Sequence, residues 1–191
     1  CSSDLASRKR SETPGAGELI ARKQPHHDRG ARPLGWYRSL QESRGRKEAN
    51  CFLIEGSRAV GFVRDHRPDL ILEILATAEA PDHTGFTSRR LTNDQMRRIA
   101  LSQYPKGPLA VVRIPEQSFE SLLPADTGER IVLLEDIQDP GNVGTLIRTA
   151  AALGYTGIIL SDKSADPFSP KAVQANAGSV VSVWIRRSAD Y

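Results

Sequence analysis

Asn142 and Arg148 are the residues of this sequence whose types and spacing most clearly suggest chemistry. An arginine offers a planar fork of donors that suits a phosphate or a carboxylate, and an asparagine can both donate and accept hydrogen bonds. The pair follows a turn at Asp139, and an apolar run, Ile131 to Leu134, stands just before that turn. We therefore expect a helix that leaves the carboxyl end of a buried strand, which is where open α/β sheets place their ligands.

The start of this helix is predicted from local residue chemistry. Asp139 suits the N-cap, and Pro140 suits the first helical position, where its missing N–H costs nothing. Two glycines leave the start of the helix open to a backbone or a ligand, so that Arg148 is expected over a patch of small residues. The residues that recur at helical spacing and are predicted to face the sheet are Val143, Ile147, Ala150 and Gly154, and the two glycines are Gly141 and Gly144.

Spacing alone leaves plainer roles open for both residues. Arg148 could simply pair with Glu135 or Asp136 at the end of the strand, and Asn142 could be only a turn or cap residue. Other chemistries are unsupported. The sequence has neither the glycine pattern of a dinucleotide site nor that of a phosphate loop, and no serine stands in a nucleophile elbow. The only cysteines, Cys1 and Cys51, and the four histidines have no metal-ligand spacing, so we expect no metal.

Charge is concentrated at the front of the chain. The net charge is +3, and residues 1–50 contain 11 Lys or Arg against 6 Asp or Glu. This excess favours a polyanionic partner such as RNA, although a solvated polar tail fits it equally well. No apolar run is long enough to span a membrane, and no signal peptide is visible, so we expect a cytoplasmic protein with no membrane partner.

Four segments are predicted along the chain. Residues 1–33 are expected to be a disordered basic and polar tail, 34–115 a first small α/β domain, 116–129 a linker and 130–191 a second α/β unit. The second unit should contain βαβ connections with parallel pairing. The predicted helices are 36–49, 55–66, 92–101, 140–153 and 170–177, and the predicted strands are 51–54, 70–76, 109–114, 131–135, 157–160 and 180–186.

Two sets of motifs resemble a known family. The stretch from Asp139 to Gly154, Asp-Pro-Gly-Asn-Val-Gly-Thr-Leu-Ile-Arg-Thr-Ala-Ala-Ala-Leu-Gly, resembles the first motif of the SpoU/TrmH branch of SPOUT RNA methyltransferases, and the likeness continues through 158–161, 166–171 and 172–179. Upstream, residues 46–48, 52–56 and 104–107 resemble the L30e-like substrate-binding domain of the rRNA-modifying members. Together the resemblance covers about residues 36–188.

The resemblance implies both a fold and an activity. The expected fold is α/β, with a small L30e-like α/β/α domain followed by the first half of a SPOUT (α/β knot) methyltransferase domain. The implied activity transfers a methyl group from S-adenosylmethionine to a ribose 2′-hydroxyl of structured RNA, with rRNA favoured, and a full-length form is expected to be a homodimer. Arg148 and Asn142 match the catalytic positions, and Glu135 is a candidate support for Arg148. Because a free guanidinium keeps its proton, we expect Arg148 to orient the ribose and phosphate, and Asn142 to shape the loop.

The residues expected to contact RNA are less specific. A solvated helix face is the alternative for the basic residues. Trp36, Tyr37 and Tyr104 could stack on unpaired bases, although packing roles suit each of them equally well. The basic candidates are Arg38, Arg44, Arg46 and Lys47 in the first predicted helix, with Arg89 and Arg90 as a second set.

The chain departs from the family pattern at its carboxyl end. The later motifs, which hold the methyl donor in the family, have no counterpart before Tyr191. We therefore expect a C-terminally truncated chain whose donor-binding residues lie beyond Tyr191, and the sequence leaves open whether it is active alone. The rival hypothesis is a non-catalytic RNA-binding protein or a degenerate fragment of the family.

Overall fold

The computed structural model describes residues 32–105, 107–115, 124 and 126–189. The predicted tail, 1–33, and most of the predicted linker, 116–129, lie outside the described residues. Within the described ranges, no helix is both long enough and apolar enough to cross a membrane.

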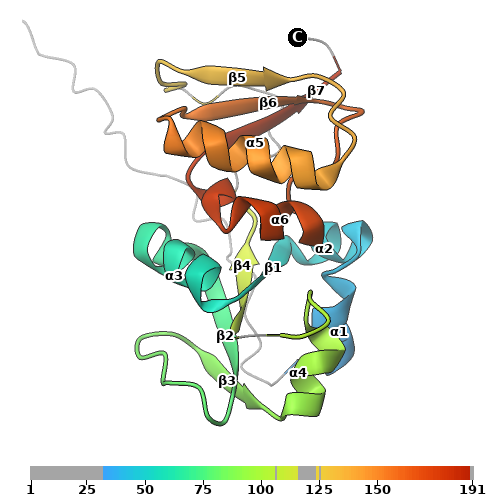
Figure 1. Cartoon of the computed structure of the whole chain (residues 1–191), viewed down its shortest axis with the longest axis vertical. Helices are drawn as coiled ribbons and strands as arrows, with labels where there is room; N and C mark the ends of the chain where they lie inside the picture. Colours follow the sequence, from blue (N-terminus) through green and yellow to red (C-terminus); the bar gives the residue numbers. More distant parts are fainter. Residues whose placement is uncertain (1–31, 106, 116–123, 125, 190–191) are drawn as a thin grey trace, which may run out of the picture. The chain divides into compact units, whose positions relative to one another are not determined.

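The first half of the described chain forms a mixed four-stranded sheet with order β1-β4-β2-β3 (Figure 1). Strand β4 is antiparallel to both of its neighbours, whereas β2 and β3 are parallel. A capping box begins α4, because the Thr92 hydroxyl accepts from the Gln95 amide and the Gln95 side chain returns the bond. The elements are α1 (Leu34–Ser39), α2 (Ser43–Ala49), β1 (Cys51–Glu55), α3 (Ser57–His66), β2 (Ile71–Thr77), β3 (Ser88–Leu91), α4 (Asn93–Ile99) and β4 (Leu109–Arg113), with a 3-10 turn at Pro68–Leu70.

The second half forms a three-stranded parallel sheet with order β5-β6-β7, which confirms the predicted parallel pairing. On this sheet Gly157 of β6 pairs in register with Trp184 of β7. A Cβ at position 157 would overlap the indole ring, so the aromatic ring fills the space that the glycine leaves. The elements are β5 (Ile131–Leu134), α5 (Pro140–Ala152), β6 (Gly157–Ser161), α6 (Pro170–Asn176) and β7 (Trp184–Ser188), with a 3-10 turn at Ser179–Val181.

The core explains how the two sheets are joined. Strand β1 alternates between two hydrophobic clusters, because Phe52 belongs to one cluster and Leu53 to the other. The cluster that contains Phe52 continues into the second half of the chain, where Phe168 and Val181 belong to it. The Phe52 and Phe168 rings are 5.1 Å apart between centroids. Residues from both sheets therefore share one continuous core.

Two predicted elements differ from the structure. The helix predicted at 36–49 is two helices, α1 and α2, separated by a turn at residues 40–42. The Arg46 guanidinium donates to the carbonyl oxygens of Leu40 and Gln41 in this turn, and a side chain thus satisfies backbone groups at the helix end. The strand predicted at 180–186 begins only at Trp184, because Ser179–Val181 forms a buried 3-10 turn. A short apolar run does not separate these two conformations.

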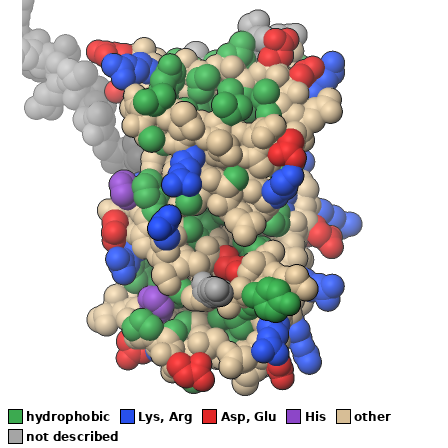
Figure 2. Space-filling view, viewed as in Figure 1, with side chains coloured by type: hydrophobic (Ala, Val, Ile, Leu, Met, Phe, Trp, Pro, Cys, Tyr) green, Lys and Arg blue, Asp and Glu red, His purple; other side chains and the backbone are tan. Residues whose placement is uncertain are grey.

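Strand β5 is not the buried strand that its apolar residues predicted. Ile131 is 38% exposed and Leu133 is 45% exposed, whereas Leu134 is buried. Strand β5 lies at one edge of the sheet among the described residues, so one of its faces has no layer over it there. Figure 2 shows hydrophobic side chains at the surface of this upper part of the molecule. Sequence analysis also missed β3, whose polar sequence Ser-Arg-Arg-Leu has no strand signature.

Candidate functional site

The start of α5 is built as the sequence predicted. The Asp139 Oδ1 atom accepts from the backbone amide of Asn142 at 2.9 Å, and Pro140 occupies the first helical position. The Lys171 Nζ atom donates to Asp139 Oδ2 at 2.5 Å, and thereby ties this N-cap to the start of α6. The bond from Lys171, helped by the amide of Asn142, lowers the pKa of the Asp139 carboxyl. The cap is therefore held as a carboxylate at neutral pH.

Helix α5 buries one face and exposes the other. The buried residues are Val143, Gly144, Ile147 and Ala150, while Asn142 and Arg148 are exposed. A Cβ at Gly144 would overlap the Ala172 carbonyl oxygen, so this glycine lets the backbone of α6 lie directly against α5. The prediction for Gly154 is wrong, since this residue ends the helix with a φ of +76° instead of facing the sheet.

Arg148 makes no ion pair with Glu135 or Asp136 in the described part of the chain. Asp136 is engaged elsewhere, because it accepts from the Ser161 hydroxyl at 2.8 Å and lies 3.7 Å from Lys163 Nζ. The guanidinium of Arg148 is therefore exposed and available to an external group. The supporting role of Glu135 stays a prediction.

A polar network that sequence analysis missed lies at the carboxyl ends of β5 and β6. Asp136 adopts a left-handed conformation with a φ of +51°, which is uncommon outside glycine. Its amide donates to the Ser161 hydroxyl at 2.8 Å, and the amide of Ile137 donates to the Ser164 hydroxyl at 3.2 Å. The Ser164 hydroxyl in turn donates to the carbonyl oxygen of Leu134 at 3.2 Å. The only sequence signal was an aspartate placed just after a strand.

This sheet edge was tested as a site for S-adenosylmethionine. Its buried hydroxyls, Ser161 and Ser164, are hydrogen-bonded to each other and to the 134–137 backbone. The Arg187 guanidinium, which also reaches this edge, donates to the carbonyl oxygens of Ser164 and Ala165. These groups therefore already satisfy one another, and the described residues do not fit the methyl donor as a complete site. We assign no donor-binding residue and derive no step through the donor.

Arg46, predicted to bind RNA, has a different role in the structure. Its side chain is only 4% exposed, and its Nη2 atom donates to Asp166 Oδ2 at 2.5 Å. Asp166 Oδ1 accepts from the backbone amide of Phe168 at 2.8 Å. This guanidinium is buried and engaged, so its assignment to RNA is corrected: it joins α2 to the loop that precedes α6.

The other candidates for RNA binding divide by their contacts. Arg89 donates to the carbonyl oxygen of Arg32 at 2.5 Å and to the Tyr37 hydroxyl at 3.3 Å. Arg90 donates to the carbonyl oxygens of Thr77 and Ala80 and pairs with Asp82. Both side chains are therefore used within the fold. Arg38, Arg44 and Lys47 are exposed, and Arg44 pairs with Glu48 at 2.7 Å.

The aromatic candidates separate in the same way. Tyr37 is fully buried, with its hydroxyl donating to Glu73 Oε2 at 2.8 Å, so the stacking prediction for it is wrong. Trp36 is partly buried, with the guanidinium carbon of Arg32 3.9 Å from its ring centroid. Tyr104 is 76% exposed. On the face drawn in Figure 2, basic side chains are spread among acidic ones, so net charge does not by itself locate a nucleic-acid surface.

No group of three or more His, Cys, Asp or Glu side chains placed to hold a metal ion occurs among the described residues. The arrangement that remains is a parallel sheet with a network of polar residues at its carboxyl edge and an exposed Asn142 and Arg148 on the following helix. Such an edge defines an α/β protein with a ligand site at the strand ends.

Comparison with known proteins gives the family. Residues 129–191 match the SpoU rRNA Methylase family, and this segment of the chain belongs to it. The chain is 32% identical to a 23S rRNA (guanosine(2553)-2′-O)-methyltransferase of Bacillus subtilis over 147 residues, which cover 75% of this chain and 56% of that protein. It is 29% identical to a 23S rRNA (uridine(2479)-2′-O)-methyltransferase of Streptomyces viridochromogenes, over 90% of this chain and 60% of that protein.

Solved structures agree with the sequence relatives. The SpoU methyltransferase AviRb of Streptomyces viridochromogenes, determined in complex with the cofactor AdoMet, matches with a TM-score of 0.70 and 25% identity, over 85% of this chain and 64% of that one. An rRNA methyltransferase of Sinorhizobium meliloti matches with a TM-score of 0.66 and 28% identity, over 81% and 61%. The predicted SpoU/TrmH-type α/β fold is confirmed. The chain spans between about half and three fifths of the length of the curated relatives named here.

Proposed function

We propose that the protein is an RNA 2′-O-ribose methyltransferase that uses S-adenosylmethionine and acts on ribosomal RNA. The observation that carries this proposal is the exposed Arg148 on α5, within the segment that matches the SpoU family. The similarity to two 23S rRNA 2′-O-methyltransferases supports rRNA as the substrate. S-adenosylmethionine supplies the methyl group when bound, as the AdoMet complex of AviRb suggests for its relatives.

Arg148 is proposed to hold the substrate ribose and its neighbouring phosphate. Its planar donor fork can bind two oxygens of a phosphate at once, which fixes the orientation of the nucleotide. A guanidinium keeps its proton at neutral pH, so a role in orientation is physically easier than a role as a base. Asn142, at the first turn of the same helix, is proposed to shape the loop, and Glu135 to assist Arg148.

The test compares Arg148 variants in the full-length protein, with transfer of labelled methyl groups to rRNA as the readout. Arg148→Ala is expected to lower the transfer rate by about a hundredfold or more, because a donor directed at the reacting group is lost. Arg148→Lys should recover only part of the activity, since an ammonium lacks the planar fork. Arg64→Ala, an exposed arginine on α3, is the matched control and should leave transfer unchanged.

RNA affinity separates a catalytic role from a binding role. The Arg148→Ala protein is expected to bind rRNA about as tightly as the wild type, while 2′-O-methylation, read as protection from alkaline cleavage, disappears. Normal turnover in this variant would remove Arg148 from the mechanism. A wild-type protein that binds RNA but transfers no methyl group would instead favour an RNA-binding function without catalysis.

Two further properties belong to the same proposal. The full-length protein is proposed to be a homodimer in the cytoplasm, where ribosomal RNA is the available substrate. Sedimentation equilibrium of the full-length protein tests the first point, and a single monomeric species would contradict it.

A further inference from the structure

Tyr104 is a large aromatic side chain that the fold leaves uncovered. It is 76% exposed, more than any other large hydrophobic residue that the structure describes. A single exposed hydrophobic residue is ordinary. Tyr104, however, lies beside a pocket of about 290 Å³ between the loop that follows α4 and the residues of α4 itself. Ligand pockets typically occupy about 300–1,000 Å³, so this one suits a single planar group.

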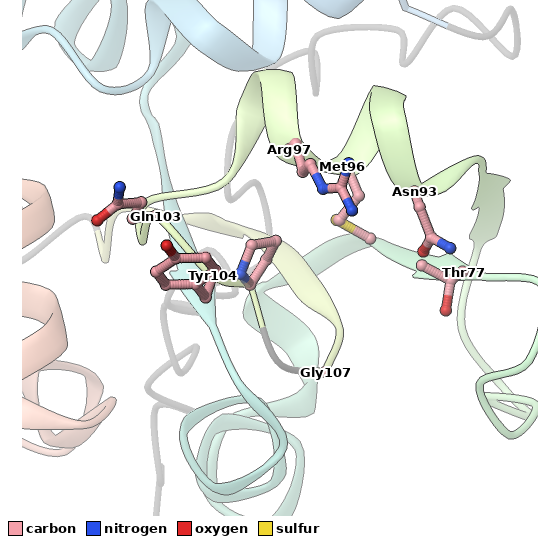
Figure 3. Close-up of a pocket in the computed structure, with 8 residues that line it drawn as sticks. Thr77, Asn93, Met96, Arg97, Gln103, Tyr104 and Gly107 are labelled. Carbon is pink, nitrogen blue, oxygen red and sulfur yellow. The ribbon is translucent and has the colours of Figure 1, made fainter.

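The pocket combines an aromatic wall with an apolar floor and polar groups. In Figure 3, Tyr104 lies on one side, while Asn93, Met96 and Arg97 from α4 lie on the other side with Thr77 at the end of β2. Met96 is buried and supplies the floor. The Asn93 amide carries both donors and an acceptor, which is the chemistry that reads the edge of a base. Gln103 is directed away from the others in Figure 3 and is not used in this argument.

The electrostatics around the pocket favour an anionic ligand. None of its lining residues is acidic. Arg97 forms only a surface pair with Asp94, at 3.3 Å and with both side chains more than two-thirds exposed, and such pairs are weak. Arg97 also lines a second hollow of about 490 Å³ together with Arg38 and Arg98. A row of three exposed arginines therefore leads away from the pocket.

Tyr104 also faces the methylase segment. It lines a further pocket of about 410 Å³, whose opposite wall includes Val173, Gln174 and Ala177 at α6. Helix α6 is the one that lies against α5 at Gly144. A chain that places one base beside Tyr104 can thus continue along α6, close to the helix that carries Arg148.

We propose that the pocket formed by Tyr104, Asn93, Met96 and Thr77 binds one unpaired base of the RNA substrate, with Tyr104 stacking on the base and the arginines of α4 and α1 holding the adjoining phosphates. Stacking on aromatic rings combined with phosphate contacts is the usual way in which single-stranded RNA is bound. This inference rests on the proposed RNA substrate and names the part of the chain that receives it.

The test measures binding of the 191-residue chain to a fluorescein-labelled RNA hairpin with a single-stranded loop, and to a fully paired RNA duplex of equal length. Tyr104→Ala is expected to weaken binding of the hairpin at least about fivefold, because one stacking contact is lost. Tyr104→Phe should keep near-wild-type affinity, since the ring remains. Binding of the duplex should be equal in all three proteins. Thermal unfolding provides the folding control, and the exposed position of Tyr104 predicts little change.

Salt dependence separates stacking from charge. The slope of log Kd against log salt concentration should be the same for Tyr104→Ala and the wild type. In Arg98→Gln it should fall by about 0.7 for each lost phosphate contact. Hairpin affinity that is unchanged in Tyr104→Ala, or weakened equally by Tyr104→Ala and Tyr104→Phe, would overturn the stacking site while leaving the proposed substrate intact. Failure of the wild-type chain to bind either RNA would overturn this inference, whereas the proposed function would still be decided by methyl transfer in the full-length protein.

Discussion

Cys51, at the start of β1, is a thiol that the fold keeps protonated. Its side chain is 3% exposed, and its Sγ donates to the carbonyl oxygen of Ala49 at 3.1 Å. Burial raises the pKa of the Cys51 thiol from 9.0 to about 11, against a smaller opposite effect of Arg32 and Arg113. Because the thiolate is the reactive form, Cys51 is not a nucleophile at neutral pH.

A Cys1→Ser chain isolates this thiol and allows a prediction at the level of one residue. At pH 8, Cys51 is expected to react with a disulfide reagent about a hundredfold more slowly in the folded chain than in denaturant, since two units of pKa change the thiolate fraction by that factor. The free energy of unfolding should fall as the pH rises from 9 toward 11, because the unfolded thiol ionises first. Equal reaction rates in both states would show that Cys51 is accessible.

How far single residues could be predicted from sequence depended on how local their roles are. Asp139 and Pro140 were correctly assigned to the start of a helix, since capping depends on neighbours in the chain. Arg46 was not, because its partner Asp166 stands 120 positions away, and no local pattern distinguishes a buried arginine from an exposed one. Arg89 and Arg90 failed for the same reason, as carbonyl oxygens brought near by folding occupy their guanidinium groups.

At the level of elements, Gly144 determines how closely α5 and α6 can approach. Gly144→Ala should lower the free energy of unfolding by about 1–3 kcal/mol, because the added methyl group meets the Ala172 carbonyl oxygen of α6 and both backbones must shift. Gly61→Ala is the matched control, since nothing lies near its Cβ position in the middle of α3. It should raise stability by up to about 1 kcal/mol through helix propensity. Urea unfolding of both variants tests the pair, and equal effects would contradict this account.

The ion pair of Arg46 with Asp166 joins α2 to the loop before α6. Arg46→Ala should lower the free energy of unfolding by about 3–5 kcal/mol, because breaking a buried pair leaves polar groups without partners. Arg44→Ala, in the same helix, removes an exposed pair with Glu48 and should cost less than about 1 kcal/mol. Chemical denaturation measures both variants. A small effect at Arg46 would mean that solvent replaces its contacts.

The elements themselves were predicted best where periodicity is strong. Helix α5 and strand β6 were placed within one residue at each end, since a helical stripe and a β-branched run were both clear. Strand β3 was missed because its register depends on β2 and not on its own sequence. The exposure of Ile131 and Leu133 was not foreseen, because apolar composition does not tell a central strand from an edge strand.

At the level of the whole molecule, the shared core predicts that the described residues unfold together. Phe52 and Val63 of the first half and Phe168 and Val181 of the second lie in one hydrophobic cluster. Separate domains at 34–115 and 130–191 remain a prediction from sequence, and they would allow two transitions. Two-state unfolding requires that different probes report the same midpoint.

The two tryptophans make this prediction measurable. Trp36 belongs to α1, beside the first sheet, and Trp184 belongs to β7 of the second. In Trp184→Phe, fluorescence reports the first half only, and in Trp36→Phe it reports the second half only. Within each variant, the midpoint from fluorescence should equal that from far-ultraviolet circular dichroism. Two midpoints in either variant would favour independent domains.

The close fit of Trp184 over Gly157 has a consequence for how the sequence can change over time. Any side chain at position 157 would collide with the indole ring, so in a saturation library glycine alone should survive there while Trp184 is present. A smaller residue at position 184 would open the space for alanine at 157, although the bond from the indole nitrogen to the carbonyl oxygen of Thr127 would be lost. The two positions should therefore be inherited as a linked pair, with a change at one permitted only after a change at the other.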